Sequence, residues 1–381
     1  MTLLTLFLST RKRNRFCVIP PIKLVLLKYN DIMFISLAMK KGGQMFGGIC
    51  LLIIILYIIF IIISPYEIML WKAIKSGNDE IIEHLINKGA NINLRDEHGC
   101  STLMSATKNG YQKIVEILLK HGVNVDADSL ICSAKKGHKD IAELLIKNGA
   151  NINAKDEKGC TALIYAAKNG YEETVNLIIK NGADVNIKDA DDCTALIYAA
   201  NNGDKRIVEL LIKNNANIDN ALIYAAKNGH KGVVDLLLKN GADINEGMSD
   251  KWTALKAAAQ NGHKEVVKLL LKKGAVVNME MSWEDSALTV AVENGHYEIV
   301  KILLKNKAII GKKELIYAIE KEHKEIVEFL LKQGIEVDTE TLICAAKKRN
   351  KEIMEVLVKH DAQNGHKEIT DVLLKYDSEL M

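Results

Sequence analysis

The sequence predicts an all-α fold: a solenoid of about ten helix-turn-helix units, some without their β-hairpin fingers, preceded by one transmembrane helix. Two observations carry this prediction. A turn glycine returns along the chain, mostly in steps of 33 residues, and an unbroken run of fifteen apolar residues precedes the first turn. A unit of this size cannot bury its own apolar face, so it must stack on its neighbours. The turn glycines are Gly110, Gly137, Gly170, Gly203, Gly229, Gly262 and Gly295.

The apolar run, residues 49–63, predicts a membrane-spanning helix. It lies in an uncharged window that starts at Gly42, and a helix of that length reaches about 33 Å, enough for a hydrocarbon core of about 30 Å. The absence of a small-x-small cleavage site argues against a cleaved signal peptide, whereas an uncleaved signal anchor stays open. We divide the chain into a basic tail over 1–44, a transmembrane helix over 45–63, a repeat array over 64–377 and a C-terminal tail over 378–381.

The charge is divided between these parts. Residues 1–63 hold eight Lys/Arg and one Asp, a net charge of +7, while the rest holds 43 basic against 47 acidic residues, a net charge of −4. The mildly acidic array argues against nucleic-acid binding, which needs a concentrated positive surface. Lysines on the N-terminal side of the predicted span favour a cytoplasmic tail, but unpaired cysteines favour a reducing environment for the array. The orientation of a single-pass membrane protein therefore stays open.

The clearest unit covers residues 159–186. Thr161 is placed to cap a short first helix, Asn169-Gly170 turns the chain, and Gly182 is a natural left-handed stop for the second helix. Apolar residues recur at helical spacing in both helices, which predicts one buried face for each. These residues are Leu163, Ala166, Ala167, Val175, Ile178 and Ile179.

The pattern G-x-T-P-L-H-x-A-A, then N-G-H, then L-L-x-x-G-A-D-V-N is recognisable in residues 194–200, 228–230 and 237–245. It resembles the ankyrin repeat, and the resemblance covers residues 64–377. The family implies binding of proteins through finger tips and the concave face of the first helices. One departure matters: Thr-Pro-Leu-His becomes Thr161-Ala162-Leu163-Ile164, so the family's histidine tie between repeats is missing. We expect stability to rest on apolar stacking instead.

The shorter steps between turns predict lost fingers. About six residues are absent between Val125 and Leu130 and at three later links, 218–222, 309–315 and 337–342. Five fingers of normal length should remain, near Asp96, Asp156, Asp189, Ser249 and Ser282. The turn glycine is replaced by Glu322 and then Arg349, and the last unit has lost its first helix, which predicts a frayed end cap over 365–376.

Recurring histidines and cysteines do not predict metal or disulfide sites. The histidines share one slot after the turn, and stacked copies lie about 10 Å apart, too far to share one ion. We expect solvent-facing turn residues there. Cys160 and Cys193 share a slot in adjacent units at the same separation, beyond the reach of a disulfide. The recurring histidines are His138, His230, His263, His296 and His323.

The best candidate for a binding surface lies at the fourth and fifth fingers. Two of the three tryptophans, Trp252 and Trp283, stand there in neighbouring units, with methionine and acidic residues around them. Exposed tryptophan ringed by polar residues is typical of an interaction hot spot, although the rings could instead fold back on adjacent repeats. A finger with Asp189, Asp191 and Asp192 is interpreted as a solvated turn. The predicted binding residues are Met248, Asp250, Trp252, Met281, Trp283, Glu284 and Asp285.

These observations favour a membrane-anchored repeat protein that binds another protein. No Gly-rich phosphate loop, HExxH, GxSxG or HRD motif is present, so we expect no catalytic residues, no cofactor, no metal and no small-molecule substrate. One alternative is a soluble, secreted or host-directed effector whose apolar segment serves export. A second is an enzymatic activity carried on the repeat, which would need a pocket with a convergent acid–base pair. A third is the degenerate product of a decaying gene, suggested by the lost fingers.

Overall fold

The computed structural model describes residues 66–218, 220–247, 252–279 and 286–364. Within this part of the chain every regular element is a helix, and the helices form ten consecutive antiparallel pairs. The chain divides after Asn151 into two compact units, each a stack of such pairs. The predicted helical repeat is therefore confirmed. The predicted transmembrane helix over 45–63 and the end cap over 365–376 lie outside the described residues.

The first unit holds three pairs. A helix over 66–76 pairs with α4, and α5 packs against both α6 and α7. Among the described residues, no helix has the length and apolar character needed to cross a membrane. The bounds are α4 Asp79–Asn87, α5 Thr102–Lys108, α6 Gln112–Lys120, α7 Ala127–Lys136 and α8 Lys139–Lys147.

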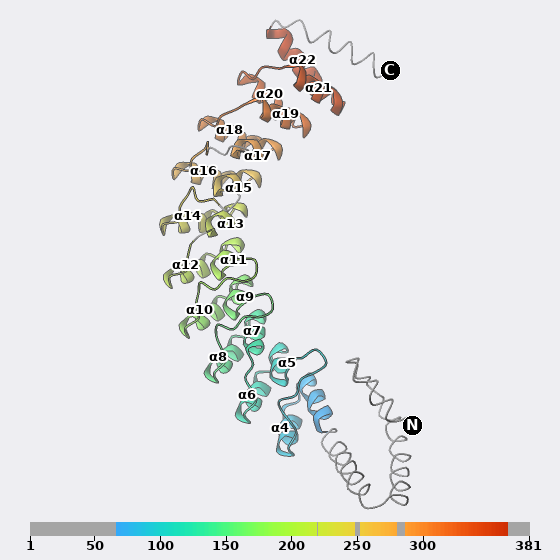
Figure 1. The fold of residues 1–381 in the computed structure, drawn as a ribbon, viewed down its shortest axis with the longest axis vertical. Helices are drawn as coiled ribbons and strands as arrows, with labels where there is room; N and C mark the ends of the chain where they lie inside the picture. The colour runs from blue at the N-terminus through green and yellow to red at the C-terminus, as the bar shows by residue number, and fades with distance from the viewer. Residues whose placement is uncertain (1–65, 219, 248–251, 280–285, 365–381) are drawn as a thin grey trace, which may run out of the picture. The chain divides into compact units, whose positions relative to one another are not determined.

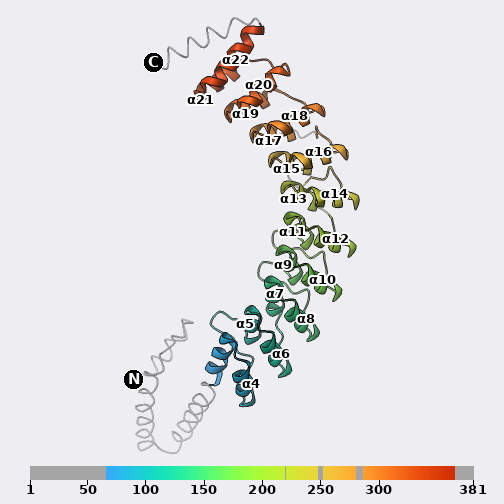
Figure 2. The same cartoon turned by 180° about the vertical axis from the view of Figure 1, so that it is seen from behind.

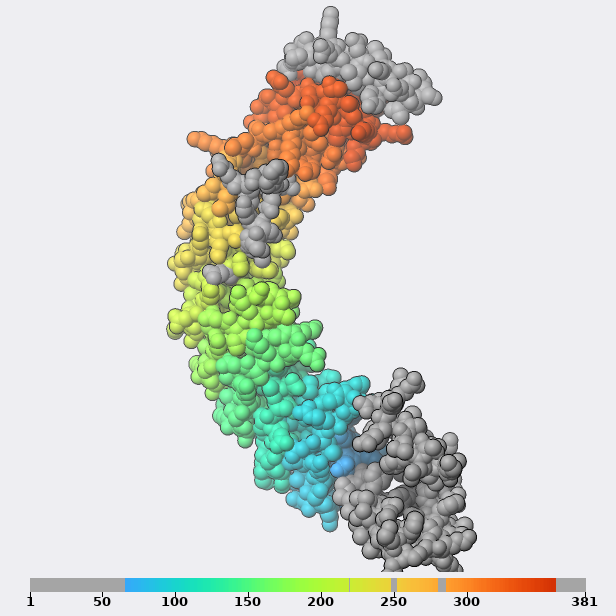
Figure 3. Space-filling model, viewed as in Figure 1, coloured from blue at the N-terminus to red at the C-terminus, as the bar shows by residue number. Residues whose placement is uncertain are grey.

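The second unit holds seven pairs, in which first helices pack on first helices and second helices on second helices (Figure 1). The view from behind shows the same two rows (Figure 2), and in the space-filling view the colours of this unit follow one another in chain order (Figure 3). The bounds are α9 Ala162–Lys168, α10 Glu172–Lys180, α11 Ala195–Asn202, α12 Lys205–Lys213, α13 Ala221–Lys227, α14 Lys231–Lys239, α15 Ala254–Gln260, α16 Lys264–Lys272, α17 Ala287–Glu293, α18 Tyr297–Lys305, α19 Lys312–Glu320, α20 Lys324–Lys332, α21 Thr339–Lys348 and α22 Lys351–Asn364.

The clearest unit follows its sequence closely. The Thr161 side chain accepts a hydrogen bond from the Ile164 amide and so caps α9. All six apolar residues predicted for the two helix faces are buried. Alanines on the first helices let neighbouring pairs approach closely, and burial of each larger aliphatic side chain contributes about 1.5–3 kcal/mol. Apolar stacking is thus one main source of stability.

Two polar ladders also tie neighbouring pairs together, which corrects the expectation that apolar stacking alone would do so. In the first ladder, an Asn side chain in the loop after five of the second helices accepts a hydrogen bond from a backbone amide of the next repeat. The amide-to-Oδ1 distances are 2.7–2.9 Å. The asparagines are Asn93, Asn153, Asn186, Asn245 and Asn278.

The second ladder is made by histidines that the sequence analysis placed in solvent. Nε2 of each ring lies 2.8–3.0 Å from a backbone carbonyl oxygen at the end of the preceding first helix. Because a carbonyl can only accept, Nε2 carries the proton and donates it. For these four histidines the expectation of a solvent-facing ring was wrong, since the turn glycine leaves room for the next ring to reach that carbonyl. The donors are His230, His263, His296 and His323.

The shortened links are confirmed where they are described. α7 begins directly after an Asp126 cap, and α21 after an Asp338 cap, with no finger in between. At the turns where glycine is replaced, Glu322 and Arg349 keep the left-handed conformation, with φ of 61° and 55°. The backbone of the turn is therefore retained without glycine, at a steric cost.

Candidate partner-binding surface

Three fingers share one turn, built by an aspartate at its start. Oδ1 of Asp96, Asp156 and Asp189 accepts hydrogen bonds from the amides two and four residues further on, at 2.9–3.0 Å. The backbone amide of each aspartate also donates to the carbonyl of the cysteine four residues on. This closed turn satisfies the finger's own polar groups, as Asx turns do. The fingers near these three aspartates are confirmed.

The fingers are turns rather than the β-hairpins that the fold class predicts. Among the described residues only isolated antiparallel bridges occur, between Arg95 and Ser101 and between Gly247 and Thr253. The aspartate closes the loop within five residues, which leaves no length for a ladder of strand hydrogen bonds. The second bridge brackets the fourth finger, whose tip, residues 248–251, lies outside the described residues. The fifth finger, residues 280–285, lies outside as well.

Tyrosines on the first helices donate hydrogen bonds to the side chains of two of these aspartates. The Tyr165 hydroxyl donates to Asp156 Oδ2 and the Tyr198 hydroxyl to Asp189 Oδ2, each at 2.7 Å. Burial raises the pKa of both phenols, and the carboxylate that each one donates to raises it further. Both hydroxyls therefore stay protonated and act as donors.

Asp189 is buried, with 8% of its surface exposed, and is not part of a solvated turn as the sequence suggested. Burial by itself would raise the pKa of its carboxyl. The hydrogen bonds from Tyr198 and from the amides of Cys193 and Asp191 outweigh burial and lower the pKa. Asp191 and Asp192 remain exposed. Only the tip of this finger is thus an acidic, solvated surface.

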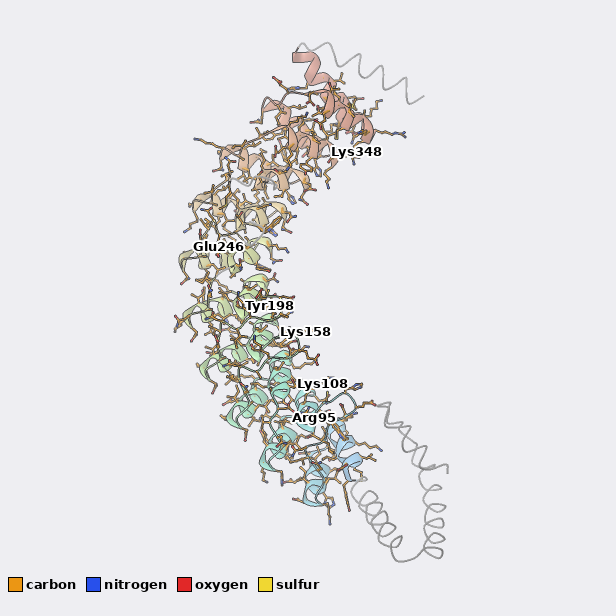
Figure 4. All side chains as sticks on the ribbon, viewed as in Figure 1. Arg95, Lys108, Lys158, Tyr198, Glu246 and Lys348 are labelled. Atoms are coloured by element: carbon orange, nitrogen blue, oxygen red, sulfur yellow. The ribbon has the colours of Figure 1, made fainter. Side chains whose placement is uncertain are left out.

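The second and third fingers are joined to each other. The Ala190 amide donates to the Lys158 carbonyl at 3.0 Å, and Nζ of Lys155 donates to the Lys188 carbonyl at the same distance. Lys158 and Tyr198 lie on the side of the first helices (Figure 4). Together these contacts hold two finger tips as one surface fixed to the helices beneath.

Of the seven predicted binding residues, the structure describes Trp252. Its ring is partly exposed, and Nζ of Lys256 lies over the ring, 4.5 Å from the ring centroid. Lys256, in the first turn of α15, is only 5% exposed. The ring therefore covers a buried cation, a contact that stabilises partly desolvated ammonium groups. The other six residues, Met248, Asp250, Met281, Trp283, Glu284 and Asp285, lie outside the described part of the chain.

The described cysteines are free, and the described residues contain no His/Cys/Asp/Glu cluster suited to a metal ion. Cys160 lies in the finger network, with Sγ 3.6 Å from Asp189 Oδ2. Burial raises the pKa of its thiol, and the neighbouring carboxylates raise it further. This thiol therefore serves as a weak hydrogen-bond donor within the finger.

A family model for ankyrin repeats (3 copies) matches residues 57–129, 126–189, 173–248 and 245–314. These matches cover more than half of the chain. The chain belongs to the ankyrin repeat family. Ankyrin repeat proteins are generally non-enzymatic scaffolds for protein–protein interaction, so the family indicates a protein partner of unspecified identity. The first match begins at residue 57, inside the predicted span over 45–63. A search among curated proteins found no match.

Sequence reasoning missed the network beneath the fingers of this ankyrin array, although a signal for it exists. A tyrosine follows each of Asp156 and Asp189 by nine residues, and a cysteine follows each by four. The aspartates were interpreted one at a time, as turn residues. Only their repetition together with the tyrosine shows that each finger is bonded to its own helix.

Proposed function

We propose that this ankyrin array is a scaffold that binds a protein partner through its finger tips and the concave face of its first helices. The observation that carries the proposal is the rigid base of the fingers. Asp156 and Asp189 fix both turns to tyrosines, and the Ala190–Lys158 bond joins the turns. A preorganised surface loses less conformational entropy when a partner binds.

Within this surface, we keep the fourth and fifth fingers as the principal contact. The residues concerned are Met248, Asp250, Trp252, Met281, Trp283, Glu284 and Asp285. Support comes from composition, because tryptophan and methionine amid acidic side chains are enriched at interaction hot spots. Trp252 is anchored over Lys256, which gives one of the two rings a fixed position.

The test separates binding by Trp252 from its structural contact. Trp252→Phe keeps an aromatic ring over Lys256, whereas Trp252→Ala removes it. In quantitative crosslinking capture by the full chain, we expect Trp283→Ala and Trp252→Ala to weaken capture several-fold and Trp252→Phe to weaken it less. Lys213→Ala, at the exposed end of the second helix α12 and outside the proposed surface, is the control. Equal capture by the wild type and by the double variant Trp252→Ala with Trp283→Ala would contradict binding at the fourth and fifth fingers.

We further propose that the array is anchored to a membrane by residues 45–63. The support is the uninterrupted apolar run and the short distance in sequence, two residues, between Ile63 and the helix over 66–76. Carbonate extraction of the expressed chain tests this, because integral proteins stay in the membrane pellet. A chain without residues 45–63 is the matched control. Recovery of the full chain in the soluble fraction would favour the alternative, a soluble secreted or host-directed effector.

A further inference from the structure

One exposed slot of the repeat changes character in two neighbouring units. The slot is the third position of the Gly-Ala-Asp-Val-Asn segment after each second helix, and it is exposed in every described copy. Seven copies are polar and two, Val276 and Ile309, are aliphatic, with 49% and 73% of their surface exposed. Met279, three residues after Val276, is 41% exposed. The polar copies are Asn91, Asn124, Asn151, Asp184, Asn217, Asp243 and Glu336.

The backbone holds these two aliphatic residues in place on the surface. The Val276 amide donates to Asn245 Oδ1 and the Ile309 amide to Asn278 Oδ1, each at 2.9 Å. The Asn278 side chain also donates to the Lys307 carbonyl at 2.8 Å, so it ties the two loops together. The same amide is bonded to an Asn side chain in three polar copies of the slot, at Asn124, Asp184 and Asn217. The backbone bonds therefore hold the aliphatic side chains of Val276 and Ile309 at the surface.

Lysines surround this aliphatic pair. Residues 272–279 and 305–310 contain four lysines and no Asp or Glu. Lys273 lies 3.8 Å from Asp235, and among the described residues the other three, Lys272, Lys305 and Lys307, have no carboxylate partner. The corresponding loops after α10 and α14 carry Asp184 and Asp243 in the slot instead. The exchange of Asp for an aliphatic residue thus removes negative charge and adds apolar surface at the same point.

We propose that Val276 and Ile309, with their lysine rim, form a docking site for an extended, acidic segment of a partner protein that carries two aliphatic residues. Neighbouring units stack about 10 Å apart, and a segment in the extended polyproline-II conformation advances about 3.1 Å per residue with three residues per turn, so residues three positions apart lie on one face about 9 Å apart. Two aliphatic residues three positions apart therefore match the two exposed side chains. Carboxylates on either side of them complement the lysines. This site is formed by the loops after α16 and α18 and uses none of the residues predicted for finger-mediated binding.

The probe is a fluorescent eight-residue peptide with valines at its third and sixth positions and glutamates at both ends. Binding to the full chain is followed by fluorescence anisotropy. The variant Val276→Asp with Ile309→Asn restores the residue types that stand in this slot in other units, so the backbone bonds are retained. We expect this variant to bind at least about tenfold more weakly, since two aliphatic contacts are lost. Asn217→Asp, in the same slot elsewhere, is the matched control and should bind as wild type does.

Each outcome decides for or against the proposal. Tenfold weaker binding by the double variant, with unchanged helical content, supports it, as does weaker binding of a peptide whose valines are adjacent. Equal binding by the double variant, or equal binding of a peptide with lysines in place of the glutamates, overturns it. Variant-sensitive pelleting with phosphatidylserine vesicles in the absence of peptide binding would assign the patch to a membrane surface and overturn it. Variant-sensitive self-association without peptide binding would overturn it too.

Discussion

At the scale of single residues, the turn glycine does two separate things. It adopts a left-handed conformation that ordinary residues avoid, and it leaves space for the next unit's histidine ring. At Gly229, φ is +77° and an added Cβ would lie 2.5 Å from Nδ1 of His263. Gly241 has φ of +92°, but nothing would lie within 4 Å of its Cβ. Alanine substitutions at these two glycines therefore separate the cost of left-handed backbone from the cost of losing the histidine hydrogen bond.

We predict that Gly229→Ala destabilises the array more than Gly241→Ala does. Gly241→Ala should cost about 1 kcal/mol, the cost of left-handed backbone alone. Gly229→Ala should cost about 2–3 kcal/mol because the His263 ring must move off the Lys227 carbonyl, which leaves that bond unmade. Urea unfolding with hydrogen exchange in α13–α16 measures both. Equal costs would mean that the histidine bond adds nothing to stability.

Asp189 predicts a pH dependence of stability at the same scale. Its folded-state pKa is lowered, so it lies below the unfolded value of about 3.9. The stabilisation is therefore fully present above that value and is lost as the pH falls through the folded-state pKa. Tyr198→Phe removes one donor to this carboxylate and should cost about 1–2 kcal/mol at pH 7.

We expect the cost of Tyr198→Phe to shrink as the pH falls below about 4 towards the folded-state pKa of Asp189, where the carboxyl becomes protonated in the folded state as well. Chemical denaturation at a series of pH values measures it. Tyr297→Phe is the control, because that ring packs edge-on against Phe329 and donates to no carboxylate among the described residues. A cost for Tyr198→Phe that stays constant down to pH 2 would contradict the role of Asp189.

At the scale of elements, the junction between α17 and α19 shows what replaces a finger. The carboxylate of Glu314 is buried, 6% exposed, at the start of α19. It accepts from the Gly311 amide at 2.9 Å and from the Thr289 hydroxyl of α17 at 2.7 Å. The Glu314 side chain thus caps α19 and also bonds to α17 of the preceding pair. In units that keep their finger, the finger turn makes this connection.

We predict that Glu314→Ala costs about 2 kcal/mol, because it leaves the Gly311 amide and the buried Thr289 hydroxyl without their acceptor. Glu320→Ala, on the exposed end of the same helix, should change stability by less than about 0.5 kcal/mol. A double-mutant cycle with Thr289→Val checks the contact. Additive effects in that cycle would show that Glu314 acts only as a cap.

At the scale of the whole molecule, the described helix pairs within each of the two units pack on their neighbours in the chain. In a repeat array of this kind, stability is approximately a sum of unit terms and nearest-neighbour terms. A local defect should therefore stay local. We predict that Leu118→Ala, which empties a fully buried site in α6, costs about 3 kcal/mol and speeds hydrogen exchange within residues 66–151.

Amides of α15–α20 should exchange at their wild-type rates in the Leu118→Ala protein. Leu303→Ala, at an equally buried site in α18, is the reciprocal control and should leave α5–α8 unchanged. Hydrogen exchange followed by mass spectrometry resolves these segments. Faster exchange throughout the chain in either variant would show a single cooperative unit and contradict the additive picture.

The helices were predictable from sequence because their signals are local. Thr161 at the start, Gly182 at the end and apolar residues at helical spacing fix a helix pair without reference to the rest of the chain. The shortened links were predictable for the same reason, because missing residues change the spacing. The candidate site was predictable only in outline, since Trp252 was expected at a finger but its cation partner Lys256 could not be identified from spacing.

The sequence by itself determined that this is a stack of helix pairs, which of its links are short, and which family it belongs to, because each repeats a local pattern. Only the tertiary structure decided what lies between the pairs. His263 and its counterparts bond across units, Asp189 is buried beneath its finger, and Glu314 stands in for a missing finger. These contacts join residues about 25 to 36 positions apart, or depend on how a turn folds back on its helix. A single repeat sequence does not show these partners, which form only when the turns fold back on their helices and the pairs stack.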